Sequence, residues 1–233
     1  MKAMPREWHK IARKASPFLK EASNIDLQNI WDDLSRTILG FLERHHDRHT
    51  FIFSSARAGE GTSTLALHTA AAVREFHNNR VVLVDGDLRQ PALHERLGIS
   101  KENGLVEVME GKITLEEAMV EEGSRGFFFL PAGRPCENPL GLLKSEAFVG
   151  LVHNLSRLFE VVIFDSAPIN PYPETPLMAS VMDGLILVVL SEKTKWEVAR
   201  AAMGKLERVQ VNILGAILNR KKYYIPPSIY QRL

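Results

Sequence analysis

The chain has 233 residues, 45% of them hydrophobic and 24% charged, and its formal net charge is +1 at pH 7. This composition is typical of a single soluble domain and excludes a strong overall attraction to nucleic acid, so we expect no nucleic-acid partner. The single cysteine, Cys136, excludes an internal disulfide, and the longest apolar run, residues 185–190, is far shorter than the ~20 residues of a membrane span. We therefore expect a cytoplasmic protein without a membrane span of its own.

Residues 1–48 are the first predicted segment, a basic arm followed by a helix. Apolar residues recur at helical spacing between residues 26 and 43 and include Trp31, which predicts one apolar helix face. An alternative for the arm is a helix that lies on anionic lipid, with Trp8 on its apolar side. Pro17 interrupts that pattern, so we favour the basic arm.

Strand and helix signals alternate through residues 49–220, the second predicted segment. The strand-like apolar runs are 50–54, 81–84, 127–130, 161–164, 185–190 and 213–218. The helical stretches between them are 63–76, 147–159, 174–182 and 195–209. Continuous apolar strands that alternate with helices predict an α/β fold, a doubly wound and mostly parallel sheet with helices on both faces. Ligands of such folds bind at the carboxyl ends of the strands.

A glycine-bearing loop follows the first of these strands and leads into an alanine-rich helix. In this context backbone N–H groups and the helix N-terminus hold phosphates, so we expect the P-loop NTPase type of fold and a site for ATP or ADP with Mg²⁺. The predicted nucleotide-binding residues are Ala58, Gly59, Glu60, Gly61, Thr62, Ser63 and Thr64. A functional loop normally has lysine before the serine, but that position is Thr62, which casts doubt on catalysis.

Acidic residues follow two of the predicted buried strands. Asp85 and Asp87 come directly after one strand, and Asp165 ends another. Any single aspartate there could simply start a turn or cap a helix. Three of them in order after a phosphate loop favour a site for magnesium, with one carboxylate available to take a proton from an attacking hydroxyl.

Together these motifs resemble the bacterial tyrosine kinases (BY-kinases) of capsule and exopolysaccharide assembly. The family loop Ser-Ala-x-Pro-Gly-Glu-Gly-Lys-Ser-Thr is matched by residues 55–64 except at Ala58 and Thr62, and its Asp-x-Asp-x-Arg-x-Pro motif by residues 85–91. Further matches are Pro131-Ala132-Gly133, Asn138-Pro139, the Asp165-Ser166-Ala167-Pro168 motif and the last strand, which ends at Asn219. The resemblance extends from residue 50 to the C-terminus.

The resemblance implies roles for particular residues. Asp85 and Asp87 would be the catalytic carboxylates, while Ser63, Asp87 and Asp165 would hold magnesium and Asn219 would lie near the adenine. Members of the family phosphorylate a tyrosine-rich tail in neighbouring subunits of a ring. They work with a membrane-embedded partner that governs polysaccharide chain length, so we expect such a co-polymerase partner, a homo-oligomer, and a location at the inner face of the membrane.

The chain departs from the family pattern at three places. Thr62 removes a charge from the loop, and Arg57 could replace that charge or remain a solvated loop residue. In the leading helix, only Arg36 matches the family's oligomerisation pattern. The third predicted segment, the tail 221–233, has only a sparse group of candidate phospho-acceptors, which are Tyr223, Tyr224 and Tyr230.

Three functions are compatible with these features. The first is a polysaccharide-assembly tyrosine autokinase whose activity is impaired by Thr62. The second is a catalytically inactive pseudokinase that serves as a scaffold for a membrane co-polymerase. The third is a positioning ATPase of the ParA/MinD type, which is disfavoured because the loop lacks the lysine pattern of that group.

Overall fold

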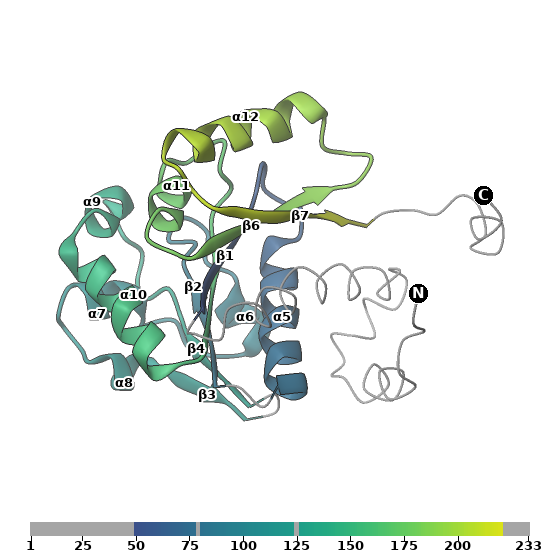
Figure 1. Cartoon of the computed structure of the whole chain (residues 1–233). Coiled ribbons are helices and arrows are strands. Elements are labelled where there is room, and N and C mark those ends of the chain that lie inside the picture. The colour runs from purple at the N-terminus through teal and green to yellow at the C-terminus, as the bar shows by residue number, and fades with distance from the viewer. Residues whose placement is uncertain (1–48, 78–79, 124–125, 221–233) are drawn as a thin grey trace.

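The computed structural model describes residues 49–77, 80–123 and 126–220, and within them seven strands form one sheet (Figure 1). The strands are β1 (His49–Ser55), β2 (Val81–Asp85), β3 (Val120–Glu122), β4 (Phe127–Leu130), β5 (Val161–Asp165), β6 (Gly184–Leu190) and β7 (Ile213–Asn219). Their order across the sheet is β3-β4-β2-β5-β1-β6-β7. All neighbours are parallel except β3, which pairs antiparallel with β4. The predicted doubly wound, mostly parallel sheet is confirmed.

The central strands are buried on both faces, which explains why they read as unbroken apolar runs. In β1, Phe51 and Phe53 belong to one hydrophobic core and Ile52 to the other, and β5 alternates in the same way. Side chains of successive strand residues point to opposite faces of the sheet, so in a strand covered on both faces apolar residues are favoured at every position.

Helices cover both faces of the sheet, as predicted (Figure 1). The helices are α5 (Thr62–His77), α6 (Leu93–Leu97), α7 (Leu105–Met109), α8 (Leu115–Ala118), α9 (Pro139–Leu143), α10 (Glu146–Leu158), α11 (Glu174–Ala179) and α12 (Trp196–Arg208). Apolar residues of α5 and α6 pack in the core with Phe51, whereas those of α7, α10, α11 and α12 pack in the core with Ile52. The long helices begin and end within a few residues of the predicted limits.

Some of the short elements were not predicted as such, among them helix α9 and strand β3. Helix α9 begins at an Asn138 cap, whose side chain accepts a hydrogen bond from the Gly141 N–H (3.0 Å), followed by proline at the first helical position. Strand β3 has only three residues and two of them are glutamates, so it lacks the apolar run by which the other strands were recognised. Short, charged strands are typical of a sheet edge, where β3 lies.

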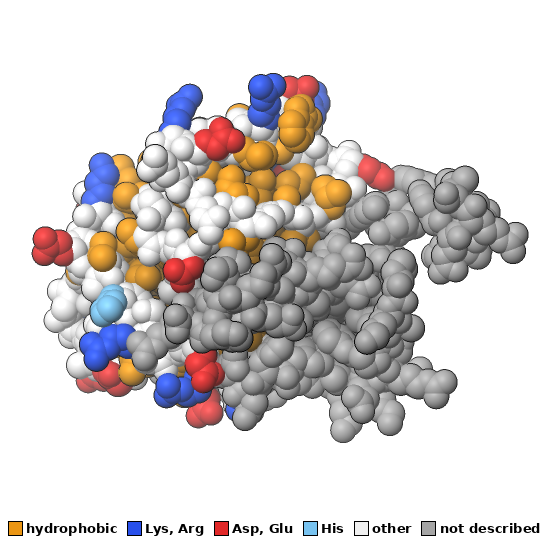
Figure 2. Space-filling model, viewed as in Figure 1, with side chains coloured by type: hydrophobic (Ala, Val, Ile, Leu, Met, Phe, Trp, Pro, Cys, Tyr) orange, Lys and Arg blue, Asp and Glu red, His pale blue; other side chains and the backbone are white. Residues whose placement is uncertain are grey.

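The opposite edge of the sheet exposes apolar surface. Hydrophobic side chains gather over the β6–β7 edge beneath α12 on the face shown in Figure 2. Leu218 of β7 is 49% exposed, and Trp196 at the start of α12 is 66% exposed. Within the described ranges, no helix combines the length and the apolar character that crossing a membrane requires.

Several predictions from the sequence lie outside the described residues. They are the arm and helix of residues 1–48, including Trp31 and Arg36, and the tail 221–233 with its three tyrosines. The division of the chain into three segments stays a prediction.

Candidate nucleotide and magnesium site

The phosphate loop joins β1, which ends at Ser55, to α5, which begins at Thr62. Gly59 and Gly61 have φ angles of 81° and 93°, in the region that side chains rarely adopt, so glycine is required at both turns. The loop delivers the chain to the N-terminus of a 16-residue helix, where free N–H groups and the helix dipole favour an anion.

The buried side chain of Glu60 stabilises the conformation of the loop. Its carboxylate accepts hydrogen bonds from the Arg57 N–H (3.1 Å) and from the Thr194 hydroxyl. The Ser55 hydroxyl donates to the Arg57 carbonyl (2.8 Å) and closes the same turn. The Glu60 carboxylate is thus engaged with the protein, and the backbone is the part of Glu60 that remains for a ligand.

Asn219 at the end of β7 rests on the loop. Its Nδ2 donates to the Glu60 carbonyl (2.8 Å), and a Cβ added at Gly61 would collide with that amide group. The structure therefore brings Asn219 to the phosphate loop, as a direct support of its backbone. Its expected place near an adenine stays a prediction.

Asp85 and Asp165 lie side by side at the carboxyl ends of two adjacent strands. They are paired residues in the register of β2 and β5, and the Gly86 N–H donates to the Asp165 carbonyl (2.9 Å). Glycine at position 86 permits this approach, because an added Cβ would lie 2.8 Å from the Asp165 carbonyl oxygen. Both carboxylates are almost fully buried, and each has an Oδ1 atom without a hydrogen-bond partner among the described residues.

Burial disfavours the charged form of both groups. It raises the pKa of Asp85 to about 7, against the opposing effect of the Leu93 N–H, which donates to Asp85 Oδ2 (3.2 Å). Burial and the neighbouring Asp85 raise the pKa of Asp165 well above its ordinary value, and the nearby Ser63 hydroxyl opposes that rise. Ser63 therefore lies close to one of its predicted fellow magnesium ligands.

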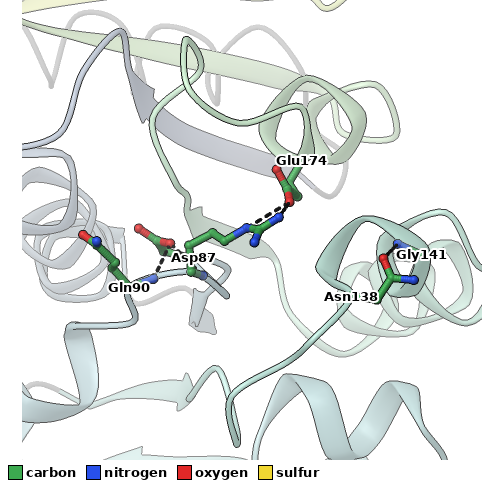
Figure 3. Close-up of polar contacts among 6 residues, drawn as sticks. Asp87, Gln90, Asn138, Gly141 and Glu174 are labelled. Atoms are coloured by element: carbon green, nitrogen blue, oxygen red, sulfur yellow. Dashed lines mark hydrogen bonds and ion pairs between the residues drawn. The ribbon is translucent and has the colours of Figure 1, made fainter.

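Asp87 lies on the turn that follows β2, and its carboxylate faces its own backbone (Figure 3). Asp87 Oδ1 accepts hydrogen bonds from the N–H groups of Arg89 (3.1 Å) and Gln90 (2.9 Å). Partial burial raises the pKa of Asp87, and nearby Glu174 adds to the rise. Asp87 is thus held at the rim of the site, with one carboxylate oxygen used by the turn.

Arg89 forms a second interaction at this rim that the sequence did not indicate. Its Nη2 lies 2.5 Å from Glu174 Oε1 (Figure 3). Its guanidinium carbon lies 5.4 Å from the ring centre of Tyr172. Glu174 is buried at the start of α11, so the bridge ties the Asp87 turn to that helix. No local pattern relates residues 89 and 174, which only the fold brings together.

The loop position without lysine is filled by a nearly buried, uncharged side chain, since Thr62 is 8% exposed. Arg57, the substitute cation considered from the sequence, is exposed on the loop. A different cation, Arg96 of α6, reaches the loop instead, and its Nη1 donates to Thr64 Oγ1 (2.6 Å). Arg96 was not predicted from the sequence. The one feature that could have indicated it is a basic residue shortly after the strand that ends at Asp85.

The donor set fits a magnesium ion that shares its coordination with a ligand. Within the described ranges, no group of three or more His, Cys, Asp or Glu side chains is arranged to hold a metal alone. Mg²⁺ in nucleotide sites usually takes one or two carboxylates, phosphate oxygens and water. The free Oδ1 atom of Asp165, the Ser63 hydroxyl and the carboxylate oxygen of Asp87 that its turn leaves unused match that smaller requirement.

The chain is similar to bacterial tyrosine kinases of known sequence and structure. No model of a protein family matches the chain. The tyrosine-protein kinase YwqD of Bacillus subtilis is 32% identical over 187 residues, which cover 80% of this chain and 78% of YwqD. Among solved structures, the kinase domain of VpsO superposes with a TM-score of 0.76 at 28% identity, covering 89% of this chain and all of that domain.

A more distant likeness concerns the fold alone. The septum site-determining protein MinD of Pyrococcus horikoshii, solved with Mg-ADP, has a TM-score of 0.63 at 23% identity and covers 79% of this chain and 76% of MinD. By its similarity to YwqD and VpsO, the chain belongs to the bacterial tyrosine kinase family of capsule and exopolysaccharide assembly.

Proposed function

We propose that the protein binds ATP or ADP with Mg²⁺ at the carboxyl ends of β1, β2 and β5, and that it transfers phosphate to tyrosine only weakly. The observation that carries this proposal is the pair of buried carboxylates, Asp85 and Asp165, with free oxygens beside the Ser63 hydroxyl. Burying two acids that each have an unpaired oxygen is unfavourable. A bound cation would compensate for that penalty.

Each residue has a distinct part in this proposal. Backbone N–H groups of residues 58–63 hold phosphate oxygens, with the dipole of α5 behind them. Ser63, Asp165 and the second oxygen of Asp87 are the ligands for Mg²⁺, which neutralises charge on the phosphates when bound. Asp85 is the general base, because a pKa of about 7 allows a carboxylate to accept a proton from a tyrosine hydroxyl near neutral pH.

Thr62 limits the activity. A lysine ammonium 4 Å from a phosphate charge is worth about 4 kcal/mol at an effective dielectric constant near 20. Thr62 offers no charge, so transition-state stabilisation is weaker than in a loop with lysine. For this reason the second candidate is a nucleotide-binding scaffold without kinase activity.

The proposal includes the cellular setting that the family implies. The substrate tyrosines are those of the tail, Tyr223, Tyr224 and Tyr230, in the same or a neighbouring copy of the chain. The partner is a membrane-embedded polysaccharide co-polymerase, which would keep the protein at the inner face of the membrane. Regulation of exopolysaccharide or capsule synthesis is then the role of both candidates.

Two measurements on the purified full chain test the proposal. Calorimetric titration with Mg-ADP measures binding, and incubation with radiolabelled ATP measures tyrosine labelling. We expect binding by the native chain, weak labelling that Asp85→Ala abolishes, and stronger labelling by Thr62→Lys. Labelling should disappear when the three tail tyrosines are changed together to phenylalanine.

The outcomes separate the candidates. Binding without any labelling, in the native chain and in Thr62→Lys alike, selects the scaffold. If only Thr62→Lys binds Mg-ADP, the native protein is not a nucleotide-binding protein and both candidates are wrong.

A further inference from the structure

Helix α6 brings a positive charge to the phosphate loop that belongs to none of the motifs in the sequence. Arg96 lies near the end of this five-residue helix and is half-buried. Its Nη1 donates to the Thr64 hydroxyl (2.6 Å), and Thr64 is the third residue of α5. The guanidinium is therefore located at the first turn of the helix whose N-terminus faces the phosphates.

The strand ends adjoin the place where Arg96 is held. Helix α5 follows β1, and β1 pairs with β5, which ends at Asp165. The first turn of α5, which the guanidinium contacts at Thr64, therefore borders the region between the phosphate loop and the carboxylates.

Arg96 retains unused binding capacity. Among the residues that the structure describes, no carboxylate forms an ion pair with Arg96, and the Thr64 oxygen to which it donates a hydrogen bond belongs to a neutral hydroxyl. A guanidinium has five N–H donors in a planar fork that matches the oxygens of a phosphate. Arg89, by contrast, is already paired with the buried Glu174.

We propose that Arg96 is the phosphate-binding cation that replaces the lysine absent at position 62. This inference rests on the proposed nucleotide binding and names a further residue of that site. The charge comes from α6, across the Thr64 contact, instead of from the loop itself. Arg57, which is exposed, does not serve this role.

The test measures the affinity of the full chain for Mg-ADP in a double-mutant cycle of Arg96→Gln and Thr62→Lys. In the native background we expect Arg96→Gln to weaken binding about tenfold or more, since it removes a phosphate charge pair. With lysine at position 62 the same change should weaken binding less than about threefold, because the lysine then supplies the charge. Arg57→Gln is the matched control and should change the affinity less than about twofold.

Two further measurements separate binding from folding. Arg96→Lys keeps the charge and should keep most of the affinity, and the melting temperatures without nucleotide should agree between Arg96→Gln and Arg96→Lys. The inference is wrong if Arg96→Gln binds Mg-ADP as the native chain does, or if its loss is the same in both backgrounds. In those cases the native chain still binds, so the proposed function stands. Absence of native binding would overturn both.

Discussion

The candidate site has two halves, the strand ends and the phosphate loop, which differ in how many of the family's charged groups they retain. The strand-end half has all of its charged groups, with Asp85 and Asp165 in register and Asp87 at the rim. The loop half has the backbone shape but lacks its cation, since Thr62 stands at the lysine position. The difference shows that the shape of a phosphate loop and its charge are separate properties.

The reason lies in what supports each half. The loop is held by glycine turns at Gly59 and Gly61, by the Glu60 carboxylate and by Asn219, and none of these depends on residue 62. The strand ends bring acidic side chains together in a region of low dielectric constant, where the charge of one carboxylate shifts the pKa of the next. A change of charge is therefore tolerated in the loop and has large effects at the strand ends.

The largest expected effect is a pH dependence that belongs to the strand-end half. The pKa of Asp85 is about 7 in the folded protein, against 3.8 for an ordinary aspartate in the unfolded chain, so the folded state binds more protons between these two pH values. Stability is then full below the unfolded value and falls as pH rises through about 7, by at most roughly 4 kcal/mol. Denaturant unfolding between pH 4 and 8 measures this slope, and Asp85→Asn should reduce it, leaving the part that comes from the buried Asp165.

Glu95→Gln, a change at an exposed residue of α6, is the control and should keep the native slope. Equal slopes for Asp85→Asn and the native chain would show that Asp85 is ionised at low pH, and the strand ends would no longer contrast with the loop. Added Mg²⁺ should reduce the slope, since it favours the ionised carboxylates.

A smaller effect is expected from closing the space between the strand ends. Gly86→Ala would place a methyl group 2.8 Å from the Asp165 carbonyl oxygen and 2.6 Å from Met178 Cε. The overpacking should destabilise the protein by about 2 kcal/mol, measured by denaturant unfolding. The control is Gly150→Ala in α10, where an added Cβ would have no atom within 4 Å. This change should raise the free energy of unfolding by about 0.5–1 kcal/mol, because alanine favours the helix over glycine. An unchanged stability for Gly86→Ala would contradict the close approach of β2 and β5.

The smallest expected effect concerns the support of the loop. Thr194→Val removes the hydroxyl that donates to the buried Glu60 carboxylate and should lower the unfolding free energy by about 1–2 kcal/mol. Mg-ADP affinity should fall with it, while Thr194→Ser should preserve both quantities. If Thr194→Val retains the native affinity, the loop holds its shape without the Thr194 contact, and the proposed support of the loop by the β6–α12 connection is wrong.

The sequence predicted the elements whose signals are local. Continuous apolar runs identified six of the described strands, and Asp85 and Asp165 were expected at one edge because parallel strands end together. Their direct pairing could not be read from the sequence, since it requires β5 to lie between β2 and β1. The β3 strand was missed because two of its three residues are charged and only the edge of the sheet requires it there.

The contacts missed in the site join residues that lie far apart in the chain. Arg89 meets Glu174 across 85 positions, Thr194 meets Glu60 across 134, and Arg96 meets Thr64 across 32. Glu60 was expected in the nucleotide site from its place in the loop, but its interior carboxylate depends on a threonine from the distant β6–α12 connection. Such contacts are consequences of topology and leave no spacing pattern in the chain.

The buried Glu60 carboxylate has a consequence for how a ligand would be received. Since the turn is already set by Arg57 and Thr194, little backbone entropy remains to be lost when an anion arrives. Such pre-organisation raises the affinity for an anion without adding new contacts. The affinity of the loop for an anion also depends on where α12 begins, because Thr194 lies just before that helix.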